Sequence, residues 1–223
     1  MSIILHMGVH LITGAAILLL TLDKWLSSLK TYINAGMLGA LISITPDITK
    51  FFGDVYLHSL ITVPFVGAAF AWVIRKTLHV RWMAAWVSAM AALFIGHLLI
   101  DFLGNGVNLL YPFVHEEQNF SILNEMNELI ISILFGIAVI SMVIWKKRPP
   151  AATIAVMLVI LFVTALSISN GTINAILHKR YAAEHPEYIT VYPANVPFHW
   201  NYYVRIDHLT IIPGQGQYLH ISQ

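Results

Sequence analysis

The sequence predicts an all-α polytopic membrane protein with about six transmembrane helices and a small β-rich extracytoplasmic C-terminal cap. Of its 223 residues, 58% are hydrophobic and only 10% are charged, whereas a soluble globular domain carries about a quarter charged residues. The apolar residues also gather in several runs of roughly the 20 residues that a bilayer requires. The composition therefore excludes a soluble enzyme and makes the lipid bilayer the first expected partner.

Six candidate spans follow one another along the chain. They cover residues 3–20, 33–48, 56–74, 82–103, 129–145 and 151–168. The first has neither a basic flank nor a small-residue cleavage site, so we expect it to be retained as a span. The second is the weakest, because it is short and ends in Thr45-Pro46-Asp47, but its small residues favour close helix packing. Residues 1–169 are the expected transmembrane domain.

The basic residues predict the orientation of these spans. Eight of them follow the first, third and fifth spans: Lys24, Lys30, Arg75, Lys76, Arg81, Lys146, Lys147 and Arg148. The opposite short loops hold only Lys50, and residues 104–128 contain four Glu and no Lys or Arg. Cytoplasmic loops carry the excess of Lys and Arg, so we expect both termini on the outer side.

The last part of the chain, residues 170–223, is polar and aromatic. Short strands are expected at residues 188–192, 199–205, 209–212 and 218–221, and Pro213-Gly214-Gln215-Gly216 is expected to join the last two. Trp200, Tyr202 and Tyr203 suit either the core of this cap or the lipid headgroup level. This segment is the expected extracytoplasmic β-rich domain.

The available side chains limit the chemistry. The chain has no Cys, so disulfides, thiolate nucleophiles and iron–sulfur clusters are excluded, and His and carboxylates are the remaining strong metal ligands. The formal net charge of +1 provides no strong field for nucleic acid, which is not an expected partner. The sequence also lacks the G-x-S-x-G, P-loop, H-E-x-x-H and dinucleotide-binding motifs.

Ionisable residues fall at one end of the predicted spans. An Asp at mid-bilayer costs about 2.5–3.5 kcal/mol on insertion scales, so each such residue needs a partner, water or a function. On the predicted orientation, six of them lie in the outer half: His6, His10, Asp47, His58, His97 and Asp101. A random scatter would not produce this common depth.

His97 and Asp101 are spaced i,i+4, which places imidazole and carboxylate on one helix face. This spacing suits two ligands of one metal, or a ligand His oriented by a carboxylate. A buried His–Asp hydrogen bond that only joins helices explains the pair equally well. His6 and His10 repeat the spacing, and here we expect His10 to be a ligand and His6 to be an interfacial side chain.

The remaining candidates each have a plain structural alternative. Asp47 suits either a solvated helix end or a metal ligand, and its depth favours the ligand. His58, followed by Ser59, suits either the cap of the third span or a ligand. Glu128 begins the fifth span and is the best candidate for a base or an extra ligand, whereas the other Glu residues of the 104–128 loop are expected to form a solvated rim. Nitrogen and oxygen ligands without thiolates favour Zn²⁺, with Mn²⁺ second.

Several short motifs resemble the YdjM-like family of bacterial and archaeal inner-membrane proteins, which are regarded as metal-dependent hydrolases. They are Val9-His10-Leu11-Ile12-Thr13-Gly14, Pro46-Asp47-Ile48, His58-Ser59, Gly96-His97-Leu98-Leu99-Ile100-Asp101, Gly104-Asn105-Gly106 and Leu110-Tyr111-Pro112. The segment from Pro193 to Trp200 is similar to the tail of longer members. The resemblance implies an inner-membrane location and the matching His and Asp side chains as metal ligands.

The chain departs from the family pattern at two places. The family commonly has Pro-Asp-x-Asp-His, but Thr49 and Lys50 replace its last two residues, and Gly53 and Asp54 stand where the family commonly has His-Arg. These losses argue against a centre with two metals. The outcomes left open are a replacement ligand from Asp54 or Glu128, a centre with one metal, and loss of activity. We expect one divalent ion, and the full set of expected ligands is His10, Asp47, His58, His97 and Asp101.

The expected function is a membrane-embedded metal-dependent hydrolase with its site at the extracytoplasmic face. Its substrate would be a lipid or envelope ester or phosphoester, and Asp101 and Glu128 would be catalytic. The alternative is a non-enzymatic membrane protein, either a cation-binding carrier or an envelope scaffold. A carrier should place polar groups at the membrane midplane, and the inner halves of these spans contain few.

Overall fold

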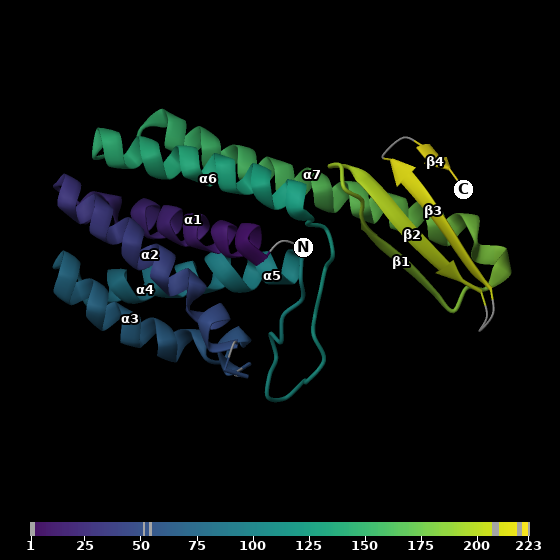
Figure 1. Ribbon diagram of the computed structural model, residues 1–223, viewed down its shortest axis with the longest axis horizontal. Helices are drawn as coiled ribbons and strands as arrows, with labels where there is room; N and C mark the ends of the chain where they lie inside the picture. The colour runs from purple at the N-terminus through teal and green to yellow at the C-terminus, as the bar shows by residue number, and fades with distance from the viewer. Residues whose placement is uncertain (1–2, 51, 54, 207–209, 218–219, 223) are drawn as a thin grey trace.

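The computed structural model describes residues 3–50, 52–53, 55–206, 210–217 and 220–222. Its α-helices are α1 (Ile3–Leu22), α2 (Leu29–Lys50), α3 (Val63–Leu78), α4 (Trp82–Leu93), α5 (Leu99–Leu103), α6 (Glu125–Trp145) and α7 (Pro150–Arg180). The π-helical segment η3 (Phe94–Leu98) joins α4 to α5. The helices lie side by side as an elongated bundle, and the strands pack beside the far end of α7 (Figure 1).

Four helical segments are long and apolar enough to cross a membrane: Ile3–Trp25, Trp82–Leu103, Glu125–Trp145 and Pro150–Arg180. The other two expected spans also occur as helices, α2 and α3, but α3 has only 16 residues and α2 is more polar. A membrane protein with several candidate spans is therefore supported. Six spans and their orientation stay predictions.

The third expected span begins later than the sequence suggested. Tyr56–His58 form a single 3₁₀ turn, η2, and α3 starts at Val63. The Ser59 hydroxyl donates to the Tyr111 carbonyl (2.6 Å) and accepts from the Ile61 amide (3.2 Å). These bonds join Ser59 to the loop after α5, and the residue before α3 is Thr62, so the alternative in which His58 and Ser59 cap the third span is wrong.

Helix α1 packs against α2, α4 and α6. Gly14 of α1 and Gly39 of α2 face each other so closely that a Cβ atom on either would collide with the other's backbone carbonyl. A Cβ on Gly96 of η3 would lie 3.2 Å from the Cα of Gly14. Three helical segments therefore touch through their backbones, as small residues allow in membrane proteins.

Helix α7 continues 12 residues beyond its expected end at residue 168. Ser169, Ile173 and Leu177 lie one turn apart on one buried face, which packs against the strands. The Trp200 indole N–H donates to the Ser169 hydroxyl (2.9 Å). The helix thus carries the chain through the expected domain boundary between residues 169 and 170.

The strands form one antiparallel sheet in the order β1 (Tyr188–Pro193), β2 (His199–Arg205), β3 (Ile211–Gln217) and β4 (His220–Ser222). The first two expected strands are confirmed. The expected turn at residues 213–216 is wrong, because these residues pair with β2 inside β3. The Tyr202 ring lies where a Cβ of Gly214 would be, so the glycine allows close packing instead of a turn.

The three aromatic side chains of the tail had been expected either in the core of the cap or at the headgroup level. Trp200 and Tyr202 are fully buried and belong to the core of the cap, whereas Tyr203 is 42% exposed. Residues 209 and 218, where two strands were expected to begin, lie outside the described residues.

Candidate metal centre

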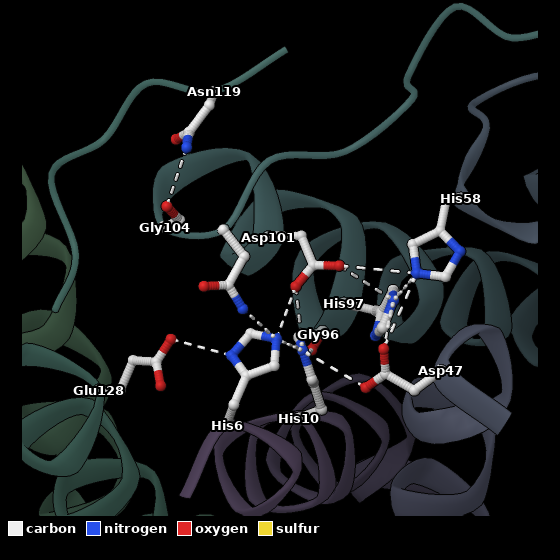
Figure 2. Close-up of polar contacts among 11 residues, drawn as sticks. His6, His10, Asp47, His58, Gly96, His97, Asp101, Gly104, Asn119 and Glu128 are labelled. Carbon is white, nitrogen blue, oxygen red and sulfur yellow. Dashed lines mark hydrogen bonds and ion pairs between the residues drawn. The ribbon is translucent and has the colours of Figure 1, made fainter. Parts of the chain in front are cut away.

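Side chains from five helical elements converge in one cluster (Figure 2). His6 and His10 come from α1, Asp47 from α2, His58 from η2, His97 from η3 and Asp101 from α5. One ligand atom from each of His10, Asp47, His97 and Asp101 lies within 4.8 Å of the others. The common depth expected from the sequence thus corresponds to a compact group that could hold a metal ion.

Asp101 lies at the middle of this group and is buried. Its Oδ1 is 2.9 Å from His6 Nε2 and 3.2 Å from His10 Nε2. Its Oδ2 is 3.4 Å from His97 Nε2 and 3.7 Å from His58 Nε2. The two oxygens of one carboxylate therefore face two different pairs of imidazoles.

Asp47 faces the same group from α2, one residue after Pro46. Its Oδ1 is 3.8 Å from His58 Nε2 and 3.9 Å from His97 Nε2, and its Oδ2 is 3.8 Å from His10 Nε2. These separations are too long for hydrogen bonds. The carboxylate is positioned toward the imidazoles without bonding them directly.

The π-helical turn positions His97. Residues 94–98 interrupt the α-helical spacing between α4 and α5, and such π-bulges occur often at functional sites. The His97 ring also contacts the rings of His10 and His58, with centroids 4.2 Å and 5.0 Å apart. The expected contact between His97 and Asp101 is present across this irregular turn.

A backbone hydrogen bond orients His10. Its Nδ1–H donates to the Gly96 carbonyl (2.9 Å), and its Nε2 faces Asp101 Oδ1 at 3.2 Å. Metal-binding histidines usually have their second nitrogen bonded in this way. The close approach of Gly14 and Gly96 brings this carbonyl within reach of the imidazole.

The structure places His6 inside the cluster, where we had expected an interfacial residue. Its Nε2 is 3.0 Å from His10 Nε2, and its Nδ1 is 3.0 Å from Glu128 Oε1. The Asn105 amide donates to His6 Nε2 (2.9 Å). The repeated i,i+4 spacing with His10 was the sequence signal for His6, but no signal marked Asn105.

Glu128 is fully buried and lies behind His6, as Figure 2 shows. It contacts the cluster through that imidazole. Glu116, Glu117 and Glu125 are exposed, as expected for a solvated rim. Asp54, one of the possible replacement ligands, lies outside the described residues.

A groove of about 570 Å³ lies next to the cluster. It runs between the end of α5, the start of α6 and strand β1, and it is lined by Gly104, Asn105, Ser121, Leu123, Asn124, Glu125, Met126, Tyr192, Pro193 and Asn195. Asn105 belongs to the groove and also contacts His6. The groove is therefore connected to the cluster through Asn105, and none of the six cluster side chains lines it.

Apolar helices long enough to cross a bilayer, together with a buried His/Asp cluster, define a membrane protein with a candidate metal centre. The chain matches the family described as YdjM inner membrane protein over residues 5–171, and it belongs to that family. The family suggested by the motifs is thus confirmed. The comparisons with curated proteins and with solved structures gave no match.

Proposed function

We propose that this protein is a membrane-embedded metal-dependent hydrolase whose site lies at the extracytoplasmic end of the bundle. The observation that carries the proposal is the mutual approach, within 4.8 Å, of His10, Asp47, His97 and Asp101 in the interior of a membrane protein. The sequence-based orientation, with both termini outside the inner membrane, supports the placement of the site.

The electrostatics of the cluster favour a cation. Asp101 is buried, and its ion-pair partners among the described residues are all imidazoles. A buried carboxylate is costly unless it is paired or coordinates a metal. A divalent ion would satisfy both carboxylates and the imidazole lone pairs together. The ligand atoms, all nitrogen and oxygen, favour Zn²⁺ over Mn²⁺.

A bound divalent ion would lower the pKa of a coordinated water to about 7 and polarise a carbonyl or phosphoryl oxygen. The residues of the chain would hold and orient the reactants. Asp101 would hold the ligand set together and Glu128 would keep His6 oriented, and these two are the proposed catalytic carboxylates. The groove at Asn105 would admit the ester or phosphoester of a lipid or envelope molecule from the outer leaflet.

The carrier and scaffold alternatives find less support. Among the described residues, the buried His, Asp and Glu side chains are His10, His58, His97, Asp101 and Glu128, and all belong to this cluster or contact it. A carrier needs polar groups along a path through the membrane. A cluster confined to one end of the bundle fits a reaction site better than the path of a carrier.

Metal content and hydrolysis by the same samples test the proposal. We expect detergent-purified wild-type protein to contain zinc and to hydrolyse at least one member of a panel of p-nitrophenyl esters, p-nitrophenyl phosphoesters and phospholipid vesicles. His97→Ala should lower zinc affinity and hydrolysis by at least about 10-fold, since even changes behind the ligands cost about 10–100-fold.

The matched control is His178→Ala, which removes an exposed imidazole near the end of α7. It should retain the zinc and the activity of the wild type. Wild-type protein without bound metal would remove the chemical basis of the proposal. Metal without hydrolysis of any member of the panel would favour the carrier or scaffold.

A further inference from the structure

The cluster offers more ligands than one ion uses. Zinc in proteins is almost always four-coordinate, yet six side chains meet here: His6, His10, Asp47, His58, His97 and Asp101. Four of the six are imidazoles, and each directs its Nε2 atom toward a carboxylate. The way in which the four imidazoles are arranged around the two carboxylates indicates how many ions the cluster can hold.

One half of the cluster is formed by His6 and His10 with one oxygen of Asp101. The two Nε2 atoms are 3.0 Å apart, and they lie 2.9 Å and 3.2 Å from Asp101 Oδ1. Ligand atoms about 2.0–2.1 Å from a tetrahedral ion are about 3.3 Å from one another. These three atoms therefore already have close to the spacing of one face of a coordination tetrahedron.

The other half is formed by His58 and His97 with the second oxygen of Asp101. Here the two Nε2 atoms are 3.2 Å apart, and they lie 3.7 Å and 3.4 Å from Asp101 Oδ2. This triangle has nearly the same dimensions as the first. The two triangles share only the Asp101 carboxylate.

Hydrogen bonds behind the first pair fix which nitrogen is free. His10 Nδ1–H donates to the Gly96 carbonyl, and His6 Nδ1–H donates to the Glu128 carboxylate. Asn105 donates to His6 Nε2, so this nitrogen exchanges the amide hydrogen bond for the ion when it binds one. The Nε2 atoms of His6 and His10 and one oxygen of Asp101 thus lie together, and a cation among them would replace the contact between the two nitrogens.

We propose that the cluster binds two divalent ions bridged by Asp101, with His6 and His10 on the first ion and His58 and His97 on the second. Asp47 provides the second bridge, because its Oδ2 faces His10 and its Oδ1 faces His58 and His97 at 3.8–3.9 Å. Each ion then receives two imidazole nitrogens and one oxygen from each Asp. This replaces our expectation of a single ion and adds His6 to the ligands.

The arrangement also narrows the substrate class of the proposed hydrolase, on which this inference rests. Two ions about 3.5–4 Å apart stabilise the attacking and leaving oxygens of an in-line displacement at phosphorus. Such pairs also hydrolyse amides, but in-line displacement uses both ions on the reacting oxygens, and we therefore take a phosphoester as the expected substrate. Water would add to phosphorus as the ester P–O bond breaks, and the released alcohol would take up a proton.

A metal titration of chelator-treated full-length protein in detergent tests the number of ions. Wild-type protein should bind two equivalents of Mn²⁺ or Zn²⁺, and the Mn²⁺ form should give the electron paramagnetic resonance spectrum of a spin-coupled pair. His6→Ala and His58→Ala should each bind one equivalent without coupling. His178→Ala, the exposed control, should bind two.

Glu128→Gln provides a milder variant that keeps the side-chain volume beside His6. It should weaken binding of one of the two ions by about 10–100-fold, the usual effect of changing a group behind a metal ligand. Its hydrodynamic profile in detergent shows whether the fold is intact. If Glu128→Gln bound both ions as tightly as the wild type, the ion assigned to His6 and His10 would be contradicted.

The number of metal ions bound per chain distinguishes a failure of this inference from a failure of the proposed function. Saturation of the wild type at one equivalent, or two equivalents in His6→Ala, would overturn the two-ion centre and leave the single-ion hydrolase standing. Binding of no metal by the wild type would overturn both, and the imidazoles would then be protonated partners of the two carboxylates. Two ions with hydrolysis of carboxylic esters alone would contradict the phosphoester assignment.

Discussion

At the scale of single residues, Gly14 controls how closely three helical segments meet beneath the metal centre. Its Cα lies against Gly96, whose carbonyl accepts the hydrogen bond from His10. A side chain at position 14 would collide with Gly39 and Ser43, and so push α2, which provides Asp47, away from α1, which provides His10. The geometry of the centre therefore depends on a residue that has no polar side chain.

Gly14→Ala should destabilise the protein and weaken metal binding. The added Cβ would collide with the Gly39 carbonyl and with Ser43, and overpacking of this kind costs about 1–3 kcal/mol. Thermal unfolding in detergent and zinc content measure the two effects. We expect a lower melting temperature and less bound zinc.

Gly8→Ala is the control on the same helix, because its Cβ would meet no atom within 4 Å. Removing a helical glycine there should be neutral or stabilise the fold by up to about 1 kcal/mol. Equal melting temperatures for the two variants would show that the contact between Gly14 and Gly39 does not determine the packing.

The sequence predicted most of the cluster from spacing and depth. The i,i+4 pair His97 and Asp101, together with His10, Asp47 and His58, followed from counting residues along the spans. His6 was assigned to the membrane interface because depth alone does not show what covers a helix end. The contacts from Asn105 and Glu128 depend on tertiary structure, which residue counting does not reveal.

At the scale of elements, Trp200 joins α7 to the sheet by both packing and a hydrogen bond. Trp200 is 1% exposed, and its indole N–H donates to the Ser169 hydroxyl. Neither partner is charged, so the bond should contribute about 0.5–1.5 kcal/mol. The indole ring also fills the space between β2 and the helix.

Trp200→Phe should loosen the cap without unfolding the helical bundle. The substitution removes the donor and leaves a smaller ring, so limited proteolysis should cut the segment after residue 180 faster than in the wild type. Trp145→Phe makes the same chemical change at a 62% exposed position and serves as the control. Equal cleavage rates in the two variants would argue against this role for Trp200.

Local patterns predicted the helices and two of the strands, and they failed where tertiary contacts override them. The polar residues after position 168 suggested the end of a span, but the sheet covers them and α7 continues to Arg180. Pro213 and Gly214 suggested a turn, but the Tyr202 ring requires a glycine inside the strand. The π-helical turn at residues 94–98 had no sequence signal.

At the scale of the whole molecule, basic residues of the connections after α1, α3 and α6 gather at the end of the bundle opposite the cluster. Lys24, Arg81 and Arg148 line one pocket, and Arg75, Lys76 and Arg81 line another. These residues come from connections that are far apart in the sequence. The folded arrangement is consistent with the orientation that the loop charges predict.

Cysteine labelling tests this orientation, since the chain has no Cys of its own. His115→Cys, in the loop between α5 and α6, should react with an impermeant maleimide in intact cells. Lys147→Cys, between α6 and α7, should react only after the cells are opened. The reverse pattern would place the metal cluster at the cytoplasmic face and contradict a site in the outer leaflet.

Helix α7 also determines how far the sheet stands from the lipid. Its 31 residues correspond to a length of about 46 Å at 1.5 Å per residue, whereas the hydrocarbon layer is about 30 Å thick. In a spanning orientation about three turns would project beyond the layer, and the sheet packs along this projecting part. The number of helical residues would then fix the height at which the sheet meets a neighbouring molecule.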